Sequence, residues 1–489
     1  MMSDTKSEKR MILNIGVIQG AMLFITLFSL FASFLEVTNP LYRFSFLQPL
    51  AFGVGLLAFQ KIWKFAFAKI SGAIILTTYF VRLSLLPLLA VFGNHASFIP
   101  EGSLNTESYA IANFLSVYEF FVVGIFLMSR AKNSCGSIYD NYALPLTDGQ
   151  LPHLGQRVPF LLKLTIVGMV VYMLYIFVSD TTVIRHNFSL LVGAPKGWYV
   201  RATYRSIYDS GKGVLGILVT LTVYVFWYIQ AIVPPMLLIR IRERRMSGSA
   251  KTLAILVIAF LLFMITSGTK IHSLECGFSF LILVYLCYAK KYENTIKRIA
   301  IIGAIAAVFG VMAKSGLDGY GFENLNKVLS AYFGGVQNVA ASIYTVDHFD
   351  GFGIKNILPD IVNQIPLFGS KLKSMLHLGN TTNHLFNHSL TGGASLGQII
   401  PALGQGYSYF GVVLSPIVPL IAAALADHFD SKAMRLDNLI LKNIYLIAAI
   451  MMSRAVVTTN MMSAVIYLFH TYVSLLIVCL GYGRIMIKR

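Results

Sequence analysis

Long apolar runs, separated by short polar segments, recur along the whole chain. Most are about 20 residues long, which is the length that an α-helix needs to cross a bilayer. Within them polar and apolar residues do not alternate, as they do in the strands of a membrane β-barrel. The pattern therefore predicts an all-α, polytopic transmembrane protein of about twelve spans, near residues 11–35, 43–60, 70–92, 108–129, 158–178, 213–238, 252–267, 274–289, 299–313, 402–426, 443–459 and 462–483.

Composition and charge support this class. The 489 residues are 56% hydrophobic and only 12% charged, whereas a soluble domain carries about 25% charged residues. The net charge is 39 − 21 = +18. The distribution of basic residues between the two sides of the membrane explains this excess, so binding to nucleic acid is not needed to account for it. If the N-terminus is inside, the inner segments carry 25 basic and 9 acidic residues, and the outer segments carry 12 and 10. The positive-inside rule then predicts one integral membrane domain over 1–489 with both termini cytoplasmic.

Two predicted outer segments are longer than ordinary connections. Residues 179–212 form a basic extracytoplasmic loop, and residues 314–401 form a large one. The large loop contains amphipathic stretches at 325–344 and 354–365. We expect these stretches to form helices on the outer membrane interface.

The basic loop carries five cations against two aspartates, which is unusual for an outer segment. Arg201 and Arg205 are four positions apart and share a face if the stretch is helical, so they could hold an anionic group together with Arg185. Trp198 and Tyr204 offer aromatic faces for sugar rings. The pattern predicts a site for a phosphate-bearing glycan, and contact with lipid headgroups is the alternative.

A second polar segment, TSGTK at 266–270, interrupts an apolar stretch at the predicted outer boundary. Its amides, hydroxyls and Lys270 could bind an anion, as backbone nests do. A polar hairpin with a lysine that extends to the interface is the simpler interpretation.

Four of the ten histidines lie in the large outer loop. His384 and His388 are four apart, next to Asn383, and could bind a glycan or act as a general base. No third ligand is evident, so we expect no metal site; structural roles for some of these histidines are the alternative. The spacing does not distinguish among the carboxylates of the loop, which are Asp318, Glu323, Asp347, Asp350 and Asp360.

Charged residues inside predicted spans suggest function because they are costly there. Arg82 and Glu119 lie near the middle of consecutive spans, and we expect them to pair with each other. Arg454 has no carboxylate within a turn. We therefore interpret it as an unpaired arginine that binds an anionic ligand.

The span plan and three short segments resemble the O-antigen and capsule repeat-unit polymerases of bacteria. The segments are TSGTK at 266–270, the glycine-rich GGASLGQIIPALGQGYSYFGVVL at 392–414, and MMSRAVV at 451–457. A lysine stands at 270 where that family more often has an arginine.

The resemblance implies a glycosyltransferase on the outer face of the bacterial inner membrane, active on oligosaccharides linked to polyprenyl (undecaprenyl) pyrophosphate. It would transfer the growing chain to a new repeat unit and release polyprenyl pyrophosphate, with no cofactor. Arg454, Lys270 and His384 would be catalytic. Arg185, Trp198, Arg201, Tyr204, Arg205, Asn383 and His388 would bind pyrophosphate or glycan.

The partners implied are the lipid-linked oligosaccharides and the bilayer, with a chain-length regulator as a further candidate. The alternatives are a flippase for lipid-linked oligosaccharides and an O-antigen ligase. A flippase needs its cations in a cavity open to both faces, whereas here the unusual cations cluster on the predicted outer side. The sequence separates ligase from polymerase poorly, because both need a cationic pocket.

Overall fold

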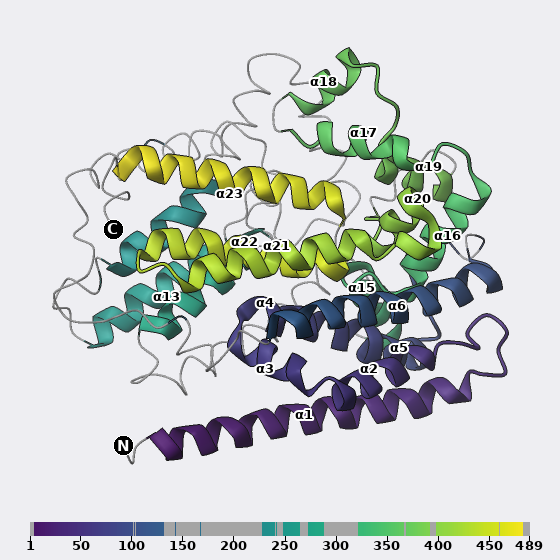
Figure 1. The fold of residues 1–489 in the computed structure, drawn as a ribbon, viewed down its shortest axis with the longest axis horizontal. Coiled ribbons are helices and arrows are strands. Elements are labelled where there is room, and N and C mark those ends of the chain that lie inside the picture. The colour runs from purple at the N-terminus through teal and green to yellow at the C-terminus, as the bar shows by residue number, and fades with distance from the viewer. Residues whose placement is uncertain are drawn as a thin grey trace.

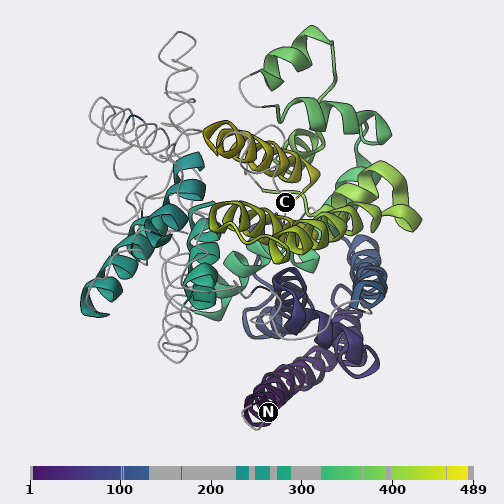
Figure 2. The same cartoon turned by 60° about the vertical axis from the view of Figure 1, so that its left-hand side comes forward.

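The computed structural model describes residues 4–131 without 101 and 103, then 142, 167, 227–239, 241, 248–264, 272–287, 321–391 without 366 and 367, and 398–482 without 459. Every regular element in these ranges is a helix, and they contain no strand. The expected all-α class is confirmed for this part of the chain. Figures 1 and 2 show its arrangement.

The N-terminal helices pack side by side in one part of the molecule (Figure 1). A rod from Ile70 to Phe92 is 23 residues long, buried over about half its length, and passes through the π-helical turn η1. Helix α2 has only 12 residues, too few to cross a bilayer, so a full span over 43–60 is not seen. The elements here are α1 (Asp4–Leu35), α2 (Leu47–Ala58), α3 (Gln60–Ala68), α4 (Ile70–Phe80), η1 (Val81–Leu85), α5 (Leu86–Phe92) and α6 (Thr106–Ala131).

Helix α22 (Leu439–Thr458) is the centre of the described bundle. It packs against α4, α21 (Ile417–Met434) and α23 (Met461–Tyr482), and nearly all its residues are buried. An apolar helix buried on every side belongs to the interior of a bundle. The middle of the chain adds α13 (Gly248–Met264) and two apolar helices over Trp227–Ile239 and His272–Cys287.

Short helices from residues 321–414, which we call the cap layer, gather at one end of the bundle (Figures 1 and 2). Helix α22 ends under this layer, since a Cβ on Gly334 would lie 2.6 Å from the Val457 carbonyl oxygen. Helix α1 begins, and α23 ends, at the opposite end of the bundle. The cap layer comprises α15 (Phe322–Tyr332), α16 (Val336–His348), η3 (Ile354–Asn356), α17 (Ile357–Val362), α18 (Gly369–Met375), α19 (Thr382–Thr391) and α20 (Ala402–Leu414).

Both amphipathic stretches are helical, as expected. Helices α15 and α16 cover 325–344, with a break at Gly334 and Gly335, and η3 with α17 covers most of 354–365. Their position on a membrane interface stays a prediction.

The span expected over 402–426 is not one straight helix. Helices α20 and α21 meet at an angle of 111°. Gly411 leaves the helical conformation with φ 71°, and Pro416 lacks the N–H that would continue the hydrogen-bond ladder. The segment after the break folds back closely on α20, because a Cβ on Gly406 would overlap the carbonyl oxygen of Ser415.

Four described helices are long and apolar enough to cross a membrane: Gly16–Leu35, Ile70–Phe92, Thr106–Ala131 and Leu439–Thr458. The bent pair α20–α21 would be a fifth. These match expected spans at 11–35, 70–92, 108–129 and 443–459. The spans at 158–178 and 299–313 lie almost wholly or wholly outside the described residues, so the plan of twelve stays a prediction.

Candidate functional site

Two arginine–glutamate pairs lie inside the bundle, and they differ in how completely they are enclosed. The first is the expected pair, which the structure confirms: Arg82 Nη1 lies 2.9 Å from Glu119 Oε2. Tyr79 donates its hydroxyl to Glu119 Oε1 at 2.9 Å, so both carboxylate oxygens have a donor. Arg82 and Glu119 have side-chain exposures of 1% and 0%. This pair is closed to any ligand and is best explained as structural.

The second pair corrects the interpretation of Arg454 as unpaired. Its Nε donates to Glu275 Oε1 at 2.8 Å, and its Nη2 donates to the Tyr467 hydroxyl at 2.5 Å. Thr458 Oγ1 lies 3.5 Å from Nη1. Glu275 and Tyr467 come from helix His272–Cys287 and from α23, so no spacing along α22 could reveal them. We call Arg454, Glu275, Tyr467 and Thr458 the Arg454 cluster.

The Arg454 cluster is less enclosed than the first pair. The Arg454 side chain is 18% exposed, whereas Glu275 is 5% exposed. Glu275 Oε2 is buried, and no donor from the described residues reaches it. The cluster therefore combines an accessible cation with a carboxylate that has one unused oxygen.

A small pocket adjoins the cluster. The indole of Trp227 is stacked on His272 with ring centroids 3.9 Å apart. The His470 ring is tilted by 52° against the same indole, with ring centroids also 3.9 Å apart. Trp227 Nε1 is buried and finds no acceptor within the described part of the chain. The lining residues are Trp227, Tyr228, Ala231, His272, Ile444, Ile447, Met451, His470, Thr471 and Ser474.

Helical spacing links this pocket to the cluster. Three lining residues, His272, Met451 and His470, stand three positions from Glu275, Arg454 and Tyr467 on their respective helices. Residues three apart on a helix are neighbours on one face. An aromatic pocket with hydroxyl groups thus lies within one helical turn of an arginine and a buried carboxylate.

The predicted histidine pair lies on α19 in the cap layer. His384 and His388 are both exposed, with ring centroids 6.1 Å apart. Asn383 Oδ1 accepts a hydrogen bond from the Ile400 amide at 3.1 Å, which fixes α19 to the segment before α20. Arg454 forms no hydrogen bond or ion pair with these three residues in the described structure.

The structure separates the carboxylates that spacing could not. Asp360 is buried and accepts hydrogen bonds from Thr382, Gln405 and Tyr409, so it joins α17, α19 and α20. Asp347 accepts from Tyr407 at 2.8 Å. Asp360 is a structural residue of the cap layer.

Six predicted site residues lie outside the described residues, and their roles stay predictions: Arg185, Trp198, Arg201, Tyr204, Arg205 and Lys270. Among the side chains that the structure describes, no three of His, Cys, Asp and Glu gather as metal ligands would.

Residues that sequence reasoning missed are Tyr467 and the pocket residues Trp227, His272 and His470. One signal was available for the partner of Arg454. Glu275 stands in an otherwise apolar run, and a carboxylate there needs a cation.

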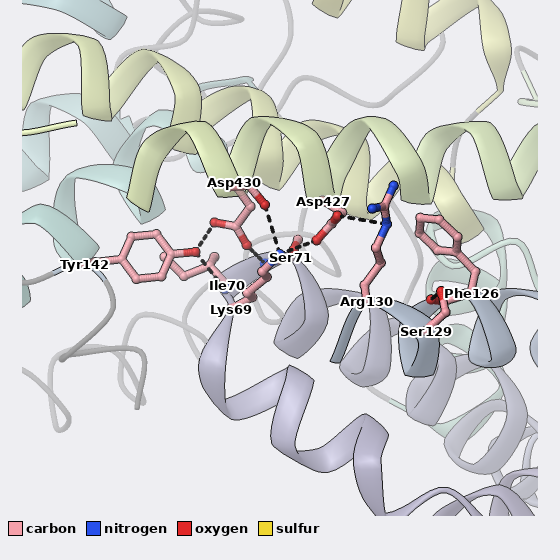
Figure 3. A network of polar contacts seen from close by, with 10 residues as sticks. Lys69, Ile70, Ser71, Phe126, Ser129, Arg130, Tyr142, Asp427 and Asp430 are labelled. Atoms are coloured by element: carbon pink, nitrogen blue, oxygen red, sulfur yellow. Dashed lines mark hydrogen bonds and ion pairs between the residues drawn. The ribbon is translucent and has the colours of Figure 1, made fainter. Parts of the chain in front are cut away.

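Another polar network, which we call the basal cluster, lies where α4, α6 and α21 meet (Figure 3). Lys69 Nζ lies 2.5 Å from Asp427 Oδ1, and Arg130 Nε lies 3.5 Å from Asp427 Oδ2. Asp430 accepts hydrogen bonds from the Ser71 amide and the Tyr142 hydroxyl. Its acidic groups are fully partnered, so the basal cluster fastens the N-terminal helices to α21.

Comparison with known proteins adds no assignment. No family model, no curated protein and no solved structure matches the chain.

Proposed function

We propose that this chain is a membrane glycosyltransferase that polymerises polyprenyl-pyrophosphate-linked oligosaccharide repeat units on the outer face of a bacterial inner membrane. The observation that carries the proposal is the Arg454 cluster. It places a partly exposed arginine beside a buried carboxylate and an aromatic pocket, near the end of the bundle that the cap layer covers.

The chemistry needs what such a cluster offers. A pyrophosphate leaving group develops negative charge as its bond to the sugar breaks, and a fixed guanidinium stabilises that charge without reorganisation. Lys270 stands two positions before His272 in the sequence and is the second cation that we propose. The basic loop at 179–212 would bind further phosphate or glycan. No nucleotide or metal is required, because the donor carries its own activation.

The proposed topology has twelve spans and two cytoplasmic termini. Helices α1 and α23 support it, because the first begins and the second ends at the same end of the bundle (Figure 1). Lys442 stands in the first turn of α22, whose other end lies under the cap layer. The positive-inside rule makes this the cytoplasmic side, so the cap layer and Arg454 would face outwards.

The test is a gene deletion complemented with variants, followed by electrophoresis of the surface glycolipid. We expect the deletion to leave core carrying a single repeat unit without a ladder, and the wild-type gene to restore the ladder. A bare core would refute the polymerase and indicate a flippase or ligase. Long polymer left on the lipid carrier would identify the ligase.

Two variants then test the site. Arg454→Ala leaves Glu275 as an uncompensated buried charge, so the double variant Arg454→Met with Glu275→Met is made beside it. Both should insert at normal levels and give no ladder. Arg435→Ala, an exposed arginine just after α21, is the matched control and should restore the ladder. A normal ladder from the double variant would remove Arg454 from the site.

A further inference from the structure

Each intramembrane ion pair has one buried atom without a partner in the described structure, but in the first pair it is a nitrogen of the cation, Arg82 Nε, and in the second it is a carboxylate oxygen. Glu119 has a donor on each oxygen, from Arg82 and from Tyr79. Glu275 has Arg454 on Oε1, while Oε2 is buried and lacks any partner in the described structure. Buried polar atoms in folded proteins are almost always hydrogen-bonded, so an exception calls for an explanation.

The missing partner must be a hydrogen-bond donor. Arg454 already balances the carboxylate charge at 2.8 Å, so a second cation is not needed, and a neutral O–H group suits Oε2. Trp227 Nε1 in the adjoining pocket is a buried donor without an acceptor among the described residues. A ligand rich in hydroxyl groups satisfies both, because each hydroxyl can donate and accept.

The pocket wall fits the same ligand class. Thr471 and Ser474 offer hydroxyls to the pocket, whereas the Trp227 ring is already packed against His272 and His470. Glu275 is on the helix that supplies His272 to this pocket, three positions further along. The pocket has a volume of about 20 Å³, which is room for a water-sized group, so a single hydroxyl of a sugar, and not its ring, would enter near Glu275.

We propose that Glu275 is the general base of the transfer reaction and accepts the proton of the acceptor sugar hydroxyl. This inference rests on the proposed function and deepens it. The acceptor oxygen forms a bond to the anomeric carbon of the donor sugar, while the bond from that carbon to the pyrophosphate oxygen breaks. The hydroxyl proton passes to Glu275 Oε2, and polyprenyl pyrophosphate leaves with the bonding electron pair. Arg454 holds Oε1 and orients the carboxylate.

The assignment displaces His384 as the base. His384 is exposed on α19 and forms no hydrogen bond with the Arg454 cluster in the described part of the chain. A general base must come within hydrogen-bond distance of the proton that it removes. Glu275 lies in the same cluster as the cation that would stabilise the leaving group.

The experiment uses the full-length protein in proteoliposomes with polyprenyl-pyrophosphate-linked repeat units, and azide as an alternative nucleophile. Azide carries no proton to lose, so its attack on the anomeric carbon needs the donor site but no base. We expect Glu275→Gln to reduce sugar transfer by about 100-fold or more, within the usual range for a lost general base. Formation of glycosyl azide should stay close to the wild-type rate.

Glu107→Gln, the same change at an exposed position on α6, is the matched control and should leave both reactions unchanged. Normal sugar transfer by Glu275→Gln would overturn the proposal. Equal loss of both reactions would also overturn it, because Glu275 would then serve folding or donor binding. The same split in His384→Gln, but not in Glu275→Gln, would assign the base to His384. If the wild-type protein forms no polymer at all, the proposed function itself fails.

Discussion

Replacing Asp430 tests whether the basal cluster holds the two parts of the bundle together. Helix α4 begins at Ile70, and its N-cap residue Lys69 makes no capping bond with its own side chain. Asp430, from α21, takes that role: its Oδ2 accepts the Ser71 amide at 2.6 Å, and its Oδ1 accepts the Tyr142 hydroxyl (Figure 3). A carboxylate at a helix N-terminus also interacts favourably with the helix dipole.

The magnitude follows from these two hydrogen bonds. Asp430 is fully buried, and a hydrogen bond to a charged group contributes about 1.5–3 kcal/mol. Asp430→Ala removes two, so we expect a loss of about 3–6 kcal/mol in the free energy of unfolding. Asp430→Asn keeps one carbonyl acceptor and should lose about half as much.

The assay is unfolding of the purified protein in detergent, followed by heat or denaturant. Asp437→Ala is the matched control, because Asp437 is exposed just beyond α21. The order of stability should be wild type and Asp437→Ala, then Asp430→Asn, then Asp430→Ala. A loss below about 1 kcal/mol in Asp430→Ala, less than one ordinary hydrogen bond, would refute the capping role.

Two further changes test the cap layer and its approach to the bundle. Gly406→Ala would place a methyl group against the Ser415 carbonyl oxygen and should lower the melting temperature. The control Gly379→Ala places its methyl group more than 4 Å from any atom beyond its chain neighbours and should leave the melting temperature unchanged. Equal melting temperatures for the two variants would contradict the tight α20–α21 bend. Burial lowers the pKa of His95, whose ring is stacked on Tyr42 at 3.4 Å, so its neutral form stabilises the fold. That stability is present above the unfolded value of about 6.5 and is lost as the pH falls below it. The melting temperature of His95→Phe should therefore depend less on pH between 7 and 5 than that of wild type. The stability that wild type loses over this range is at most about 1.4 kcal/mol for each unit by which the pKa of His95 is lowered. An unchanged pH dependence would show that His95 does not titrate on unfolding.

Sequence reasoning succeeded where the determining interactions are local. Hydropathy over about 20 residues located the rod Ile70–Phe92 and helix α22. The Arg82–Glu119 pair was predictable because consecutive spans are antiparallel neighbours, so two charges at mid-span are brought together. The helical spacing of His384 and His388 on α19 was equally local.

Prediction failed where the structure depends on contacts between distant segments or on the backbone conformation of single residues. Hydropathy treats 402–426 as one run, because it averages over Gly411 and Pro416, which break it. Arg454 looked unpaired because Glu275 is 179 positions away in the chain. No periodicity along α22 carries information about which helix packs there.

The two arginines inside the bundle show why a charge within a predicted span is a starting point for a functional hypothesis and not its conclusion. Both are paired with a glutamate and both hydrogen-bond a neighbouring hydroxyl group. Arg82 and Glu119 leave neither carboxylate oxygen unbound, and removing either partner would expose the other to the cost of an uncompensated buried charge. Glu275 leaves one oxygen without a partner in the described structure, beside an arginine whose side chain is 18% exposed. The first pair leaves only the Arg82 Nε without a partner in the described structure, and that atom can only donate. The carboxylate oxygen left free to accept a proton, and not the presence of the arginine, therefore distinguishes the candidate site from the structural pair.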